Sequence, residues 1–271
     1  MTAAGGGVAS VIDARRDAGS GALIGYLPVG FPDLDTSVDA AVALVENGVD
    51  ALELGVPYSD PVMDGPVIQA ATQRALAGGF RVRDVLTAVE RIRSRVAAPV
   101  LVMTYWNPIL QFGAETFARG LRDAGGSGLI TPDITPDADT EWIALSDAYG
   151  LERVFLAAPS STDERLRLTV AASRGFVYTV STMGITGARA DLDAAARRLV
   201  GRLRDAGAER ACVGIGISTA EQVREVLGYA DGAIVGSLLV SALADGGVAR
   251  VAAVARALAE GTRSGRPTPA H

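Results

Sequence analysis

Short apolar segments recur along the chain and are separated by longer segments of mixed polarity. Eight of them are nearly continuous in Val, Ile, Leu and Ala, a composition that is typical of parallel strands buried on both faces. They span Ala22–Leu27, Ala51–Leu54, Pro99–Met103, Gly128–Ile130, Arg153–Ala157, Phe176–Val180, Ala211–Ile215 and Gly232–Val235. The pattern predicts that these segments are the strands of one parallel sheet.

Between these strands the apolar residues follow helical spacing. A helix is expected to begin at Thr36 or Ser37 and stop at Gly48, and another to begin at Pro66 and end at Gly78-Gly79. Further helices are expected at Arg83–Val96, Glu115–Ala124, Ala138–Tyr149, Thr162–Ser173, Leu192–Asp205, Ala220–Leu227 and, near the C-terminus, Val248–Leu258. Strands that alternate with helices in this way predict an α/β fold, the (β/α)8 TIM barrel. An open doubly wound sheet is the alternative, although it usually has fewer strands.

The chain is expected to form a single domain over residues 1–271. Its length of 271 residues lies within the range of one α/β barrel, and no low-complexity linker divides it. An N-terminal arm or helix is expected over about residues 1–18, and a flexible tail over about residues 261–271. The N-terminus does not resemble a secretory signal, and no apolar run reaches the roughly 18 residues of a membrane span. We therefore expect a cytoplasmic protein.

The composition excludes several kinds of chemistry. All 25 basic residues are arginine and 31 residues are acidic, so the net charge of −6 argues against nucleic-acid binding. The single histidine, His271, is the last residue, and the single cysteine, Cys212, lies in an apolar run. Catalytic triads, Cys/His metal sites, disulfides and lysine Schiff bases are therefore excluded. Proton transfer must depend on carboxylates or tyrosine.

Two carboxylates stand where the barrel would have its active site. Glu53 lies inside an otherwise apolar strand, where burial would raise its pKa; the alternative is a structural Glu paired with an arginine of a neighbouring strand. Asp64 follows in the long loop after that strand, but Asp-Gly-Pro is also an ordinary entry into a helix. For Asp60, which precedes a proline, the turn interpretation is favoured.

Glycine-rich segments follow the last three predicted strands. They are Ser181–Ala188, Gly214–Ser218 and Gly236-Ser237. Glycine lets backbone N–H groups approach an anion, and barrels commonly bind phosphate at the loops after strands seven and eight. Their occurrence at consecutive strand ends predicts a phosphate site built from amides and hydroxyls.

The segment from Leu52 to Pro66, LELGVPYSDPVMDGP, is similar to the signature of the tryptophan synthase α subunit family. The resemblance continues in Gly175–Tyr178, Gly184–Gly187, Gly214–Ser218 and Gly236-Ser237, and it extends over about residues 21–258. It implies a lyase with a (β/α)8 fold that cleaves indole-3-glycerol phosphate, by a retro-aldol reaction, to indole and glyceraldehyde 3-phosphate. No cofactor and no metal is implied for this step.

The resemblance also implies the roles of individual residues. Glu53 matches the general acid/base, Asp64 the carboxylate that binds the indole N–H, and Tyr178 a tyrosine beside the acid/base. The implied substrate-binding residues are Thr186 and Gly187 in a closing loop, Gly216, Gly236 and Ser237 around the phosphate, and Tyr26, Met103, Tyr105, Leu156 and Ile215 around the indole. Tyr26 and Ile215 stand where the family commonly has phenylalanine.

The family works as an α2β2 heterotetramer, which implies a tryptophan synthase β subunit as partner, with pyridoxal phosphate expected only in that partner. The candidate docking surface is the loop Pro57–Met63 with the apolar segment Tyr105–Phe112. The alternative is that these residues only cover the barrel mouth. Two other functions stay open: a phosphosugar isomerase or epimerase, and a catalytically silent barrel that only activates a β subunit.

Overall fold

The eight apolar segments form the strands of a closed barrel. The computed structural model describes residues 6–138, 140–180, 189–214 and 216–263. The strands are β1 (Ala22–Pro28), β2 (Ala51–Gly55), β3 (Val100–Met103), β4 (Gly128–Thr131), β5 (Glu152–Ala157), β6 (Val177–Val180), β7 (Ala211–Gly214) and β8 (Gly232–Val235). They pair in parallel in chain order, and β8 pairs with β1. The predicted TIM barrel is confirmed.

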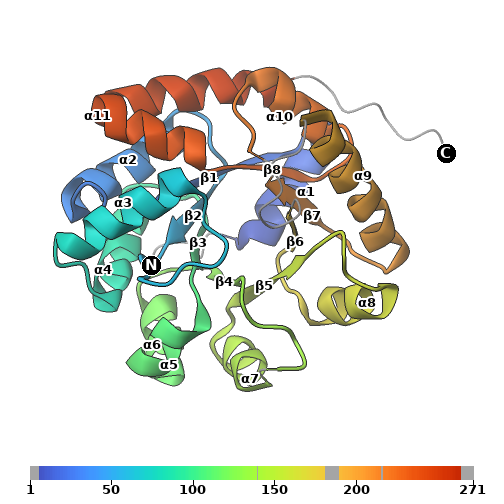
Figure 1. Ribbon diagram of the computed structural model, residues 1–271, viewed down its shortest axis with the longest axis horizontal. Coiled ribbons are helices and arrows are strands. Elements are labelled where there is room, and N and C mark those ends of the chain that lie inside the picture. Colours follow the sequence, from blue (N-terminus) through green and yellow to red (C-terminus); the bar gives the residue numbers. More distant parts are fainter. Residues whose placement is uncertain (1–5, 139, 181–188, 215, 264–271) are drawn as a thin grey trace.

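Helices surround the strands as a ring (Figure 1). They are α2 (Leu34–Glu46), α3 (Pro66–Ala77), α4 (Val82–Arg93), α5 (Trp106–Phe112), α6 (Ala114–Asp123), α7 (Thr140–Tyr149), α8 (Asp163–Ala172), α9 (Arg189–Asp205), α10 (Ala220–Leu227) and α11 (Ser237–Ala259). In α4, Val85, Val89 and Ile92 repeat on one face and are buried. The apolar faces of the helices and the outward residues of the strands form one large core.

The N-terminal helix α1 (Val8–Asp17) closes one end of the barrel (Figure 1). Val8 and Ile12 are fully buried among the inward-facing strand residues. The Glu152 carboxylate accepts hydrogen bonds from the N–H groups of Val8 and Ala9, at 2.8 and 3.0 Å, and so satisfies the first turn. Of the arm or helix expected over the first eighteen residues, residues 8–17 thus form a docked helix.

Two ends differ from their predicted positions. Helix α2 begins earlier than Thr36, because Asp33 is the N-cap and accepts a hydrogen bond from the Thr36 N–H at 2.8 Å. Gly261 and Thr262, which were expected to belong to the flexible tail, are instead part of the 3-10 helix η1 (Glu260–Thr262) that follows α11, and they are buried against α10. Residues 264–271 lie outside the described residues.

Two helices differ from the expectations in kind. The apolar segment Tyr105–Phe112, for which no helix was expected, contains α5. Pro108 is tolerated there because it lies in the first turn, where a backbone N–H would have no intrahelical acceptor. The C-terminal helix expected near Val248 begins at Ser237, directly after β8. Its backbone leaves the helical conformation at Gly246 and Gly247, and this break separates the expected helix from the turns before it.

Helix α11 with η1 is the one helix in the described part of the chain that is long and apolar enough to cross a membrane, with a mean hydropathy of 1.6. It differs from a spanning helix in its break at Gly246 and Gly247. Its buried residues, among them Leu239, Val240 and Leu243, pack against α2, α3 and β1. We therefore assign α11 to the shell of helices around the barrel.

Candidate active site

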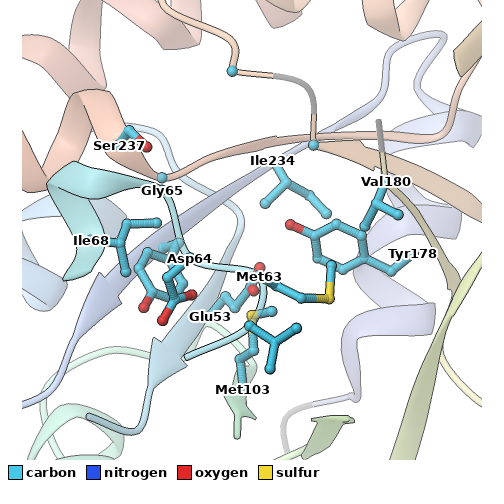
Figure 2. A pocket seen from close by; sticks show the side chains of 15 residues that line it. Glu53, Met63, Asp64, Gly65, Ile68, Met103, Tyr178, Val180, Ile234 and Ser237 are labelled. Carbon is cyan, nitrogen blue, oxygen red and sulfur yellow. The ribbon is translucent and has the colours of Figure 1, made fainter. Parts of the chain in front are cut away.

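A cavity of about 350 Å³ opens at the C-terminal ends of the strands, where active sites of this fold lie (Figure 2). Its lining includes eight of the predicted site residues: Tyr26, Glu53, Asp64, Met103, Tyr178, Gly216, Gly236 and Ser237. They come from seven places along the chain, and barrel closure brings them together. In the view of Figure 2, Tyr178 lies across the pocket from Asp64, with Glu53 and Met63 between them.

Glu53 projects from β2 into this cavity and is 1% exposed. Neither of its carboxylate oxygens has a hydrogen-bond partner within the described residues, so the expected alternative of an ion pair with a neighbouring arginine is wrong. Burial, and then the nearby charge of Asp64, raises the pKa of Glu53 from 4.5 to about 8. At neutral pH the group therefore carries a proton that it can donate to a bound molecule.

Asp64 lies in the loop between β2 and α3 and points into the same cavity (Figure 2). The alternative role of Asp64 as the N-cap of a helix is wrong, because Gly65 occupies the N-cap position of α3 and Pro66 the first helical position. Burial raises the pKa of Asp64, but the side chain is only partly buried. The cavity thus contains two carboxyl groups in different environments, which is an arrangement that separates their protonation states.

Two buried tyrosines flank Glu53, and each lies over a glycine. Tyr26 on β1 lies over Gly55, and Tyr178 on β6 lies over Gly214. Burial raises the pKa of both phenols well above 10, and the charge of Glu53 adds to the effect. Both therefore remain neutral hydroxyl donors at physiological pH. The sequence pointed to Gly214 only as part of the glycine-rich segment Gly214–Ser218, although the glycine also continues the inward-facing alternation of Cys212 on β7.

We expect Gly55→Ala to destabilise the protein by about 1–3 kcal/mol, because an added Cβ would lie 2.6 and 2.7 Å from ring carbons of the buried Tyr26. Urea unfolding measures the change. Gly201→Ala is the matched control, because nothing lies within 4 Å of its added Cβ in helix α9. Equal stability of the Gly55→Ala variant and the wild type would contradict the packing of Tyr26 over Gly55.

The other side of the cavity contains the predicted phosphate-binding elements. Gly236 is the N-cap of α11, and Ser237 is its first residue. The first turn of a helix presents N–H groups without intrahelical acceptors and the positive end of the helix dipole. Gly216 adopts a φ of +71°, which favours glycine. Together these residues form a cradle suited to an anion.

Two of the predicted pocket residues lie outside this lining, and three are not described. Tyr105 lines a small second pocket that shares Tyr26, Asp64 and Met103 with the cavity, and its hydroxyl contacts the backbone of the loop that carries Asp64. Leu156 lies beside Tyr178 in the barrel register but outside the lining. The predictions for Thr186, Gly187 and Ile215 lie outside the described residues.

The cavity also contains residues that the sequence analysis did not select as site residues. They are Val62, Met63, Gly65, Ile68, Val180, Gly214 and Ile234. Val180 lies two residues after Tyr178, and Ile234 two residues before Gly236, so alternation along the strands was a signal that could have found them. Within the described residues, no group of three His, Cys, Asp or Glu side chains could hold a metal ion.

Comparisons with known proteins give one family. The family model described as "Tryptophan synthase alpha chain" matches residues 12–264. A tryptophan synthase alpha chain of Leifsonia xyli subsp. xyli is 68% identical over 95% of this chain and 99% of its own length. One of Mycobacterium avium is 56% identical over 93% of each chain. A structure of Mycobacterium tuberculosis tryptophan synthase superposes with a TM-score of 0.90 at 53% identity, over 95% of this chain and 98% of that chain.

Proposed function

Because this chain belongs to the tryptophan synthase alpha chain family, we propose that Glu53 and Asp64 perform that family's cleavage of indole-3-glycerol phosphate. The chain is accordingly a lyase of tryptophan biosynthesis, and its products are indole and glyceraldehyde 3-phosphate. The observation that carries the assignment of residues is the buried Glu53 carboxyl without a partner beside the more exposed Asp64.

The two carboxyl groups would divide the proton transfers between them. Protonated Glu53 donates its proton to indole C3, and ionised Asp64 accepts a hydrogen bond from the indole N–H and stabilises the positive charge that develops on nitrogen. The Glu53 carboxylate then takes the proton of the adjacent glycerol hydroxyl. As that oxygen becomes a carbonyl, the carbon–carbon bond breaks and its electron pair returns to the ring. Glu53 thereby regains a proton, so the protonation state of each carboxyl group is the same at the end of the cycle as at its start.

The remaining residues would bind and orient the substrate. Tyr178 is a neutral phenol near Glu53, so its hydroxyl can donate a hydrogen bond to the substrate beside the acid/base. Gly216, Gly236 and Ser237 hold the phosphate at the N-terminus of α11. Met103 and the Tyr26 ring form the apolar wall for the indole. We extend the same role to Thr186, Gly187 and Ile215 from the resemblance alone.

We also propose that this chain needs no cofactor for the cleavage and that it acts in the cytoplasm with a β subunit that carries pyridoxal phosphate. The proposed docking surface is the loop Pro57–Met63 with Tyr105–Phe112, the segment that contains α5. It contains two of the large exposed apolar side chains in the described residues, Val62 at 71% and Leu110 at 52% exposure. An apolar surface beside the site entrance suits a partner that receives an apolar product.

The test of this function is the pH dependence of indole release from indole-3-glycerol phosphate. We expect kcat/KM to rise as Asp64 ionises and to fall as Glu53 loses its proton around pH 8, because the first step needs ionised Asp64 and protonated Glu53. Asp64→Asn should lower kcat/KM and remove the rise at acidic pH.

Three outcomes would contradict the proposal. A profile that stays flat through about pH 7–9 would remove Glu53 as the acid. An acidic rise that persists in Asp64→Asn would remove Asp64 as the group that must ionise. Absence of indole release by the wild type, even with a β subunit, would favour the silent barrel.

A further inference from the structure

The hydroxyl of Tyr105 accepts two hydrogen bonds from the backbone of the loop that carries Asp64. The donors are the N–H groups of Val62 and Met63, each 2.9 Å from the oxygen. These residues lie 43 and 42 positions from Tyr105 in the chain, and Met63 directly precedes Asp64. A single side-chain oxygen thus connects the start of α5 to the backbone next to a proposed catalytic carboxylate.

Within the described residues, the loop makes few other side-chain hydrogen bonds near Asp64. The side chain of Val62 is mostly exposed, so its burial contributes little to holding the loop. On the other side of Asp64, the Gln69 side-chain amide donates a hydrogen bond to the Asp64 carbonyl at 2.7 Å. Further away, the Asn107 amide donates to the Tyr58 hydroxyl at 3.2 Å. The position of the backbone just before Asp64 therefore depends on the Tyr105 oxygen.

Tyr105 is itself held rigidly. It is the N-cap residue of α5, and both oxygens of the Asp133 carboxylate accept from the N–H of the next residue, Trp106, at 3.0 and 2.9 Å. Its side chain is 6% exposed, and its ring packs against that of Tyr58 with centroids 5.3 Å apart. A fixed acceptor that meets two consecutive amides can define the path of a loop.

We propose that Tyr105 is a positioning residue, whose hydroxyl holds Asp64 in its catalytic place through the Val62 and Met63 amides and does not itself bind substrate. This inference rests on the proposed role of Asp64. It assigns the hydroxyl a role separate from that in the indole pocket, which the sequence resemblance implied for Tyr105 and which the ring can still have. The physical reason is that catalysis by Asp64 depends on its distance from the indole nitrogen, and small displacements of a catalytic group are costly.

The test is Tyr105→Phe, which keeps the ring and removes only the acceptor oxygen. We expect kcat for indole release to fall about tenfold while KM changes by less than about twofold. The reason is that the substitution disturbs the orientation of Asp64 but removes no contact with the substrate. In an Asp64→Asn background the same substitution should have no further effect on kcat, because Tyr105 acts through Asp64. Tyr149→Phe is the matched control, since that hydroxyl binds Glu115 on the outer helices.

Amide hydrogen exchange gives a second readout that does not depend on activity. In Tyr105→Phe the amides of Val62 and Met63 should exchange faster than in the wild type, and those of β2 should not change. Unchanged exchange at these two amides would overturn the inference, whether or not the proposed function holds.

The kinetic outcomes separate the alternatives. A higher KM with unchanged kcat would make Tyr105 a substrate contact, and a tenfold loss that persists in Asp64→Asn would mean that it acts through another group. If the wild type releases indole and Tyr105→Phe equals it, the inference fails and the proposed function stands.

Discussion

Replacing Glu53 with glutamine should lower the rate of indole release by about 10³-fold or more, since one group performs both proton transfers and general acid–base catalysis typically contributes 10²–10⁴-fold. Glutamine has nearly the shape of the protonated carboxyl group and, like it, carries no charge, so the packing inside the barrel should be preserved. It cannot release a proton to carbon or take one from an alcohol. Steady-state measurement of indole release at neutral pH, with and without a β subunit, tests the expectation.

The matched control is Glu90→Gln, the same change at an exposed position on α4. It should retain the wild-type rate, and Glu53→Gln should still bind a β subunit, because Glu53 is buried inside the barrel and is not part of the proposed docking surface. If Glu53→Gln kept normal turnover, Glu53 would not be the acid/base and the proton transfers would need another donor.

The same substitution should stabilise the fold at alkaline pH. The pKa of Glu53 rises from 4.5 to about 8 on folding, so between these values the folded chain binds one proton more than the unfolded chain. The free energy of unfolding of the wild type therefore decreases as pH rises through this window, by up to about 1.4 kcal/mol per pH unit from this group. Glutamine does not titrate, so Glu53→Gln escapes this loss.

Urea unfolding of both proteins from about pH 5 to pH 9 measures the effect. The stability of Glu53→Gln relative to the wild type should increase by a few kcal/mol over this range and level off above about pH 8. The other titrating groups are common to both proteins and cancel in the difference. A difference that does not change with pH would mean that Glu53 has an ordinary pKa, and its assignment as a neutral acid would fail with it.

These two expectations describe one physical situation. A carboxyl group without a hydrogen-bond partner inside a barrel is costly to ionise, so the folded chain keeps its proton at pH values where the unfolded chain has lost it, and the fold loses stability over that range. The same lack of solvation keeps the proton available near neutral pH. The proposed catalytic role and the loss of stability at alkaline pH therefore have a common origin, and the substitution that removes the activity should remove the instability.

Much of the barrel could be predicted from local sequence. The apolar segments are strands because parallel strands buried on both faces need continuous apolar residues, and each of the eight lies within three residues of its expected place. Pro66 begins α3, and α10 spans the predicted residues. The exceptions have local causes: Asp33 caps α2 further upstream, Pro108 is tolerated in the first turn of α5, and α11 is interrupted at two glycines.

The sequence by itself determined the fold class, the two carboxylates and the family resemblance, because these depend on the type and spacing of residues that are close in the chain. The tertiary structure decided which groups meet: Glu53 has no arginine partner, Tyr26 covers Gly55, and the Tyr105 hydroxyl receives the Val62 and Met63 amides. Such contacts join residues on different strands and loops, and closure of the barrel alone sets their distances. Burial and hydrogen bonding, and therefore the pKa of Glu53, follow from that closure.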